Sequence, residues 1–365
     1  MAEYEETEEN NVEDQTDSDD TVVAFQYDIT SFGADYDVEG LVKRLNRGDI
    51  FVPHFQREYV WNIAEASRFV ESLLLGLPVP GIFLAREAES NKLIVIDGQQ
   101  RLKTLQFFYN GFFNPHPDDK RKRIFKLFNV QNRFEGIAHE DLDEEDRIFL
   151  DNSIIHATIV KQENPKNDSS SIYHVFERLN TGGRKLEPQE IRSAIYHGSF
   201  LERIEKINKN ELWRKIFGKP HSRLKDRELI LRFFAFYSSW RQYSRPMKEF
   251  LNTFLATYRN PSDEFLLGCE NLFNSCIEII FSSIGNKAFR TGKSSINAAV
   301  FDSVTVGVAT RLTSDSRPVD TAKLRMLYAV LLTDSEYISF ISKSPASESS
   351  VFGRMRKATE AFQLI

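Results

Sequence analysis

The sequence predicts a mixed α+β (α/β) N-terminal half followed by an α-helical C-terminal half. In the first 200 residues, short apolar runs typical of strands alternate with amphipathic stretches that have the period of a helix. Beyond residue 200 the amphipathic stretches are long, and none has the features of a strand. Residues 1–20 hold ten acidic and no basic residues, and so polar a segment cannot bury enough apolar surface to fold. We therefore expect a disordered acidic tail over 1–20, an α/β core over 21–200 and a helical domain over 201–365.

Start and stop signals define the elements of the first half. Gly48 ends a helix expected over residues 37–47. Asn62 and Glu65 form a capping box that begins the next helix. A strand over 82–86 and a strand that ends at Asp97 are close enough in sequence to form a hairpin. The other elements expected here are a short element over 21–29, strands over 49–55, 125–130 and 154–160, and helices over 102–109, 140–150, 168–179 and 188–198.

The second half consists of segments with helical periodicity. They are expected over 229–240, 247–258, 266–280, 296–313, 321–332 and 351–362. The two cysteines, Cys269 and Cys276, lie on one face of the third of these segments. Their spacing is that of neither a metal site nor a redox motif, so we expect core thiols in a reducing compartment.

Composition and charge restrict the partners and the compartment. Hydrophobic residues make up 41% of the chain, with 30 phenylalanines, which is enough for a large core. Without the acidic tail, 43 acidic residues stand against 47 basic ones, so the folded part is mildly basic and suits a phosphate-bearing partner. The N-terminus lacks the regions of a signal peptide, and no apolar run approaches the roughly 20 residues of a membrane span. We expect a soluble, cytoplasmic protein with no membrane partner.

One strand-to-helix junction has the composition of a polar ligand site. Four aliphatic residues run into Asp97 and Gly98, and Gln99, Gln100 and Arg101 open the following helix. Glycine lets the backbone pass close to a ligand, and a helix start offers N–H groups and a positive dipole end to an anion. The alternative is an ordinary turn in which Asp97 caps the helix and Arg101 is solvated.

Two further turns hold polar side chains that suit an anion. Gln56 and Arg57 precede the capped helix among aromatic residues, and an arginine held in this way can grip a phosphate bidentately. The alternative is a surface turn in which Trp61 anchors the helix. Asn180 and Gly183 belong to an Asn-Thr-Gly-Gly loop that either cradles an anion or only caps a helix C-terminus.

Spacing argues against other chemistries. Residues 290–295 resemble the end of a P-loop, but the required glycine five positions before Gly292 is replaced by Lys287. The seven histidines form no zinc-binding pair, and neither a Gly-x-Ser-x-Gly motif nor an HNH-type arrangement is present.

Three motifs, in this order and spacing, resemble one family. They are Phe55-Gln56-Arg57 with Tyr59-Val60-Trp61, then Ile96-Asp97-Gly98-Gln99-Gln100-Arg101-Leu102, then Phe176-Glu177-Arg178-Leu179-Asn180-Thr181-Gly182-Gly183. Over about residues 35–200 the chain resembles the N-terminal domain of GmrSD-type modification-dependent restriction enzymes, whose core is similar to ParB and sulfiredoxin. The helical remainder, including residues 225–233, resembles the extension that accompanies this domain.

The resemblance implies a ParB/sulfiredoxin-like core that binds and hydrolyses nucleoside triphosphates. In several members this activity regulates nucleic-acid cleavage in defence against phage. The residues that the resemblance assigns to the site are Gln56, Arg57, Asp97, Gly98, Gln99, Gln100, Arg101, Asn180 and Gly183. Full-length restriction members also carry an HNH-type nuclease domain after the helices, and this chain ends without one. We therefore do not expect this chain alone to cleave DNA.

The residue types at this site fit phosphoryl transfer. Arg57 and Arg101 would neutralise phosphate charge, and the amides near Gly98 would receive a β- or γ-phosphate. Asp97 would bind a divalent ion or polarise the attacking water, which either glutamine of the motif would position. The chemistry implies Mg²⁺ as a cofactor, although no ligand spacing in the sequence indicates it.

Two hypotheses for function follow. The first is a module that binds and hydrolyses a nucleoside triphosphate within a restriction or antiphage defence system, acting with a nuclease on another chain or sensing modified DNA. The second is a non-enzymatic ParB-like module that binds DNA or protein. The basic run at 120–123 favours the second, although such a run is usually only solvated surface.

Overall fold

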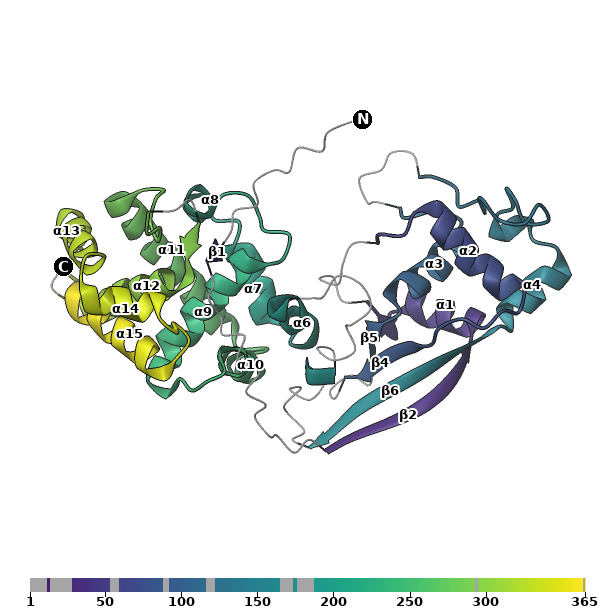
Figure 1. Ribbon diagram of the computed structural model, residues 1–365, viewed down its shortest axis with the longest axis horizontal. Helices are drawn as coiled ribbons and strands as arrows, with labels where there is room; N and C mark the ends of the chain where they lie inside the picture. Colours follow the sequence, from purple (N-terminus) through teal and green to yellow (C-terminus); the bar gives the residue numbers. More distant parts are fainter. Residues whose placement is uncertain are drawn as a thin grey trace. The chain divides into compact units, whose positions relative to one another are not determined.

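The computed structural model describes residues 12–13, 28–52, 59–87, 92–115, 122–164, 173–175, 187–292, 295–363 and 365. The chain divides into two compact units, one over Phe25–Leu186 and the other over Glu187–Ile365 together with Met1–Ala24. Among the described residues the first unit is mixed α/β and the second is helical, which confirms the predicted fold class (Figure 1).

The described part of the first unit contains a mixed sheet of five strands in the order β2-β6-β4-β5-β3. The pairs β2/β6 and β4/β5 are antiparallel, and the pairs β6/β4 and β5/β3 are parallel. The strand bounds are β2 Asp28–Asp37, β3 Ile50–Phe51, β4 Ile82–Arg86, β5 Leu93–Asp97 and β6 Ile154–Asn164. In Figure 1, β2 and β6 continue as a two-stranded ribbon beyond the other strands. The antiparallel pairing of β4 with β5 confirms the predicted hairpin.

Helices α1, α2 and α3 cover one face of this sheet (Figure 1). The helices of the unit are α1 Val38–Arg47, α2 Ile63–Leu74, α3 Gln99–Tyr109 and α4 Glu144–Asp151, with a 3₁₀ turn η1 at His139–Asp141. The capping box of α2 is present as predicted, because Asn62 Oδ1 accepts from Glu65 N at 3.0 Å and Glu65 Oε2 accepts from Asn62 N at 2.8 Å. Alternate residues of β5, Leu93 and Val95, join the helices in the core.

Several expectations for the first unit need correction. Residues 125–130 form no strand, because the only pairing described there is a bridge between Phe112 and Ile124, while Phe125 packs into the core. The helix expected over 140–150 is split, because Asp143 caps a new helix, α4. The strand β2 extends well beyond the element expected over 21–29. Of the helix expected over 168–179, only residues 173–175 are described, and they are helical.

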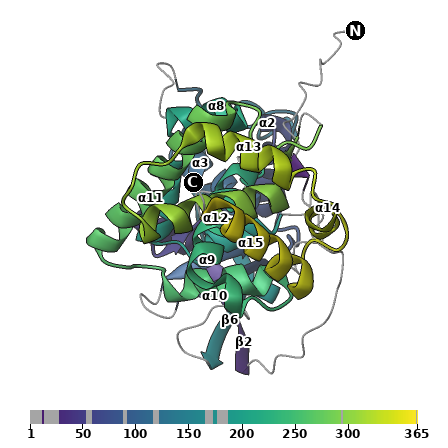
Figure 2. The same cartoon turned by 90° about the vertical axis from the view of Figure 1, so that its left-hand side faces the viewer.

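The second unit is built around α12, which is buried along most of its length. In Figure 2, α12 lies among α9, α11 and α15. The helices of this unit are α6 Pro188–Ile195, α7 Ser199–Ile207, α8 Glu211–Phe217, α9 Lys225–Ser239, α10 Met247–Thr257, α11 Asp263–Ile284, α12 Ala298–Ser314, α13 Thr321–Leu331, α14 Ser335–Ser342 and α15 Glu348–Phe362, with a 3₁₀ turn η2 at Trp240–Gln242. All six predicted helices are present, whereas α7, α8 and α14 were not predicted.

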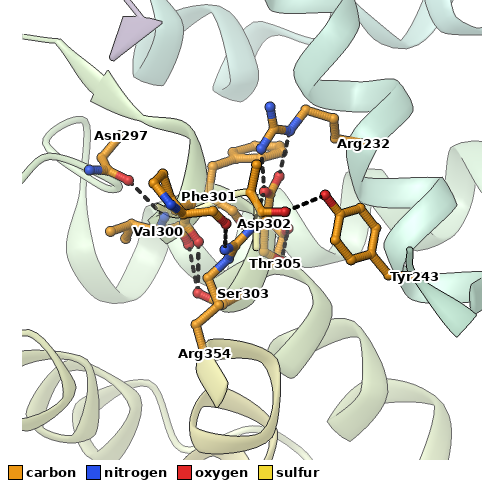
Figure 3. A network of polar contacts seen from close by, with 12 residues as sticks. Arg232, Tyr243, Asn297, Val300, Phe301, Asp302, Ser303, Thr305 and Arg354 are labelled. Carbon is orange, nitrogen blue, oxygen red and sulfur yellow. Dashed lines mark hydrogen bonds and ion pairs between the residues drawn. The ribbon is translucent and has the colours of Figure 1, made fainter. Parts of the chain in front are cut away.

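A buried ion cluster joins three of these helices (Figure 3). Asp302 of α12 is fully buried and accepts hydrogen bonds from Nε and Nη2 of Arg232 on α9 at 3.0 and 2.6 Å. Arg354 of α15, also fully buried, donates from Nη2 to Asp302 Oδ2 at 3.2 Å. One carboxylate therefore holds two guanidinium groups inside the helical unit.

Two boundaries differ from the sequence-based expectation. A parallel pair of short strands, β1 Val12–Glu13 and β7 Ile296–Asn297, is present where a disordered tail and an all-helical half were expected. The rest of residues 1–20 lies outside the described residues. The division between the units falls before α6 and not at residue 200, because Arg192 of α6 donates from Nε to Asn252 Oδ1 at 3.0 Å and thereby joins α6 to α10.

Helix α11 holds both cysteines and is both long and apolar. By length and composition alone it is the one helix in the described part of the chain that could cross a membrane. It packs against α7, α8, α12 and α13, and a single helix of this kind is weak evidence of a membrane span. Both cysteines are free; Cys276 is buried as predicted, whereas Cys269 is only half-buried. Burial raises the pKa of the Cys269 thiol to about 11.

Candidate functional site

The junction between β5 and α3 requires a glycine. Gly98 is the N-cap of α3 and has φ 100° and ψ 9°, in the left-handed region that favours glycine. A Cβ atom at this position would lie 2.5 Å from Cγ2 of Ile82 on β4. No side chain caps α3, so the interpretation of Asp97 as a helix cap is wrong. The N-terminus of α3 therefore has no side-chain cap.

Arg101 is fixed against this junction. Its Nη2 donates to Asp97 Oδ2 at 2.8 Å and to the carbonyl oxygen of Gly81 at 3.0 Å. Its side chain is 16% exposed, whereas that of Asp97 is 55% exposed. The Nε atom of Arg101 is buried and has no hydrogen-bond partner among the described residues. Arg101 is thus a positioned cation beside an exposed carboxylate, and the alternative of a solvated arginine is wrong.

Gln100 joins the junction to the segment before α2. Its Oε1 accepts hydrogen bonds from the backbone nitrogens of Val60 at 3.0 Å and Trp61 at 3.3 Å. These two residues come shortly after Gln56 and Arg57 in the sequence. The amide of Gln100 therefore positions the chain at the point where the first predicted motif ends.

Tyr59 makes a second connection between the same two segments. Its hydroxyl lies 2.7 Å from Oγ1 of Thr104 on α3, and its ring packs edge-on against Phe107 and Phe113. Burial raises the pKa of Tyr59 to about 12, so the phenol stays protonated at neutral pH. The aromatic residue of the first motif thus has a structural role in anchoring it to α3.

The structure brings five of the nine predicted site residues together at one strand-to-helix junction. They are Asp97, Gly98, Gln99, Gln100 and Arg101. The predicted residues Gln56, Arg57, Asn180 and Gly183 lie outside the described residues. Sequence reasoning missed Gly81, whose carbonyl oxygen accepts from Arg101. Any residue type offers a carbonyl, so no sequence signal could have identified it. Val60 and Trp61 belong to the first motif, but their backbone contacts with Gln100 were not predicted.

The described residues of the junction do not form a metal site by themselves. Nowhere in the described part of the chain are three or more histidine, cysteine, aspartate or glutamate side chains grouped so that they could hold a metal ion. Mg²⁺ is often bound by one or two carboxylates together with water and the phosphates of a nucleotide. Asp97 offers one exposed carboxylate. A Mg²⁺ ion at this carboxylate would therefore need water and nucleotide phosphates as its other ligands.

The fold and the junction define a mixed α/β domain with a polar, glycine-containing strand-to-helix turn, joined to a helical unit. Residues 38–197 match the family described as GmrSD restriction endonuclease, N-terminal domain. This match, which covers 160 of the 365 residues, confirms the resemblance that the three motifs predicted. Among curated proteins, no match to the chain was found.

Proposed function

We propose that the α/β unit binds a nucleoside triphosphate at the turn from Asp97 to Arg101 and hydrolyses it. The observation that carries the proposal is the fixed guanidinium of Arg101 beside the uncapped N-terminus of α3. A helix N-terminus and a positioned arginine both attract phosphate oxygens. Gly98 supplies the left-handed turn that places the start of α3 directly after the end of β5.

The geometry assigns different roles to the two glutamines. Because Oε1 of Gln100 accepts from two backbone N–H groups, we assign Gln100 to positioning the segment that carries Gln56 and Arg57. Gln99 is then the residue proposed to orient the attacking water. Asp97 would repel a phosphate unless a cation lay between them. The proposal therefore includes Mg²⁺ bound with the nucleotide, where it would neutralise phosphate charge.

The family supports a role in a restriction or defence system, because its description names a restriction endonuclease. We infer that this chain serves as a nucleotide-dependent module of such a system and acts with a nuclease on another chain or in contact with DNA. We place that activity in the cytoplasm, in accordance with the expectation from the sequence.

A panel of nucleoside triphosphates tests the proposal. Release of inorganic phosphate would be measured for the full chain with each nucleotide and Mg²⁺, with and without DNA. We expect turnover of at least one nucleotide, abolished by Arg101→Ala and reduced by Gln99→Ala in variants that keep the wild-type circular dichroism spectrum. Turnover that persists in both variants would overturn the assigned site. Salt-dependent DNA binding without any turnover would favour the non-enzymatic alternative.

A further inference from the structure

The chain after α3 presents basic and apolar side chains on the surface of the α/β unit. From Ile124 to Phe128 exposure alternates: Phe125 and Leu127 are buried in the core, whereas Ile124 and Phe128 are 53% and 54% exposed. We call the exposed side chains of this region the basic–aromatic surface. Its members are Phe112, Lys122, Arg123, Ile124, Lys126 and Phe128.

The backbone under this surface is held firmly. Phe113 N donates to Arg123 O at 2.9 Å, and Phe125 N donates to Gly111 O at 3.0 Å. Phe128 N donates to the hydroxyl of Ser67 on α2 at 3.0 Å. The partly buried ring of Phe113 packs edge-on against the buried ring of Phe125, with centroids 5.1 Å apart. The exposed side chains therefore project from a fixed support.

The charge of the surface has one sign. Lys122, Arg123 and Lys126 are exposed cations, and no acidic residue occurs from residue 120 to residue 128. Lys122 Nζ lies 5.3 Å from the ring centroid of Phe112, so cation and aromatic ring are already adjacent. Single exposed apolar residues are common on protein surfaces. Two exposed apolar side chains, Ile124 and Phe128, accompany the three cations on one anchored segment, and Phe112 adds a third from the segment that pairs with it. This set is suited to a ligand with both anionic and flat apolar groups.

We propose that the basic–aromatic surface binds single-stranded nucleic acid. Single strands are bound without sequence preference by positive surfaces that follow the phosphates and by aromatic side chains on which bases stack. Lys122, Arg123 and Lys126 contact phosphates, and Phe128 stacks against an unpaired base. In a duplex the bases remain stacked on each other, so a duplex can contact the cations of this surface but not stack a base on Phe128. This surface lies outside the nucleotide-binding turn and adds a second ligand to the α/β unit.

Fluorescence anisotropy of a labelled single strand tests the proposal with the full chain. The oligonucleotide would have roughly 20 nucleotides, longer than the site sizes of single-strand-binding folds, and would be compared with the duplex of the same sequence. We expect tighter binding of the single strand, and weaker binding as salt rises. Phe128→Ala should weaken it about 5- to 100-fold, the range for loss of one stacked base, and Phe128→Trp should preserve it. Lys126→Gln should weaken binding and lower the slope of log affinity against log salt by about 0.7.

Matched variants elsewhere on the same unit serve as controls. Phe149→Ala removes a phenylalanine of similar exposure on α4, and Lys43→Gln removes an exposed lysine on α1. Both should bind the single strand as the wild type does. The proposal fails if the wild type does not bind, if the duplex binds as tightly as the single strand, or if Phe128→Ala behaves like Phe149→Ala. None of these readouts depends on nucleotide turnover, so the two proposals can fail separately.

Discussion

The side-chain oxygen of Gln100 lies 3.0 Å from the backbone nitrogen of Val60, and this contact joins the start of α3 to the entry of α2. The same oxygen also accepts from Trp61 N. The two segments are about 40 residues apart in sequence. A glutamine of the second motif therefore holds the backbone of the first motif at Val60 and Trp61.

Replacing Gln100 should loosen the contact between the start of α3 and the segment before α2. Gln100→Ala leaves two N–H groups without their acceptor, and we expect it to cost about 1 kcal/mol of unfolding free energy and to weaken nucleotide binding as well. The measurements are denaturant unfolding and nucleotide titration. Gln106→Ala, on the same helix, removes one hydrogen bond to Asn46 and should leave nucleotide binding unchanged. Equal nucleotide affinity in both variants would contradict the positioning role of Gln100.

Gly98 should tolerate no side chain. Gly98→Ala combines a left-handed backbone with a 2.5 Å approach to Ile82, so we expect a loss of about 2–4 kcal/mol in unfolding free energy. Gly111→Ala is the matched control, because Gly111 has φ 79° and no atom within 4 Å of the added Cβ. This control should lose only about 1 kcal/mol of unfolding free energy, which is the cost of the left-handed backbone without a steric clash. Chemical denaturation distinguishes the two, and similar losses would show that the contact with Ile82 is unimportant.

The ion cluster of the helical unit should depend on its single carboxylate. Asp302→Asn leaves the guanidiniums of Arg232 and Arg354 buried without a countercharge, and breaking such a buried pair costs about 3–5 kcal/mol. Glu336→Gln, which removes an exposed carboxylate paired with Lys357 in the same unit, should cost less than about 1 kcal/mol. Thermal unfolding followed by circular dichroism compares the variants. A small loss in Asp302→Asn would mean that the cluster is not needed for stability.

Acid should destabilise the α/β unit through His139. Burial lowers the pKa of this imidazole, which packs against Tyr109 with ring centroids 4.1 Å apart. Because the folded pKa lies below the unfolded value of about 6.5, the unfolded state binds more protons. The neutral imidazole of His139 therefore contributes its full stabilisation above pH 6.5, and this stabilisation is lost as the pH falls through the lowered pKa of the folded state. Unfolding free energies measured across this interval should fall less steeply in His139→Phe.

Gln106→Ala provides the comparison for this pH dependence, because it replaces a side chain of the same unit that does not titrate. It should keep the slope of the wild type. A wild-type slope in His139→Phe would mean that another group accounts for the loss in acid.

Local signals predicted local structure, and distant partners could not be predicted. Asn62 and Glu65 lie three residues apart, so their capping box was visible in the sequence. The apolar alternation around Phe125 also suggested a strand, but a strand requires a partner chain, and here the apolar residues pack into the core while the backbone bonds to loops. The partners of Asp302 lie 70 and 52 residues away, and no single sequence pairs them.

The candidate site shows the same limit. Asp97, Gly98 and Arg101 are adjacent in sequence, and their junction was predicted from that order. Arg101 is also fixed by the carbonyl of Gly81, which lies 20 residues earlier, and any residue type offers a carbonyl. The position of these residues at a strand-to-helix turn was therefore predictable, whereas the support of Arg101 by the carbonyl just before β4 was not.

Equilibrium binding of nucleoside triphosphates to the Arg101 variants tests the central claim most directly. We expect the full chain to bind at least one nucleotide with Mg²⁺, and Arg101→Ala to weaken that binding about 10- to 100-fold, as expected for the loss of hydrogen bonds to a charged group. Arg101→Lys should restore little of the lost affinity, because the lysine ammonium cannot make the two parallel hydrogen bonds of a planar guanidinium. Arg47→Ala, which removes an exposed arginine of α1, should bind as the wild type does. Wild-type affinity in a folded Arg101→Ala protein, or no binding of any nucleotide by the wild type, would contradict the account.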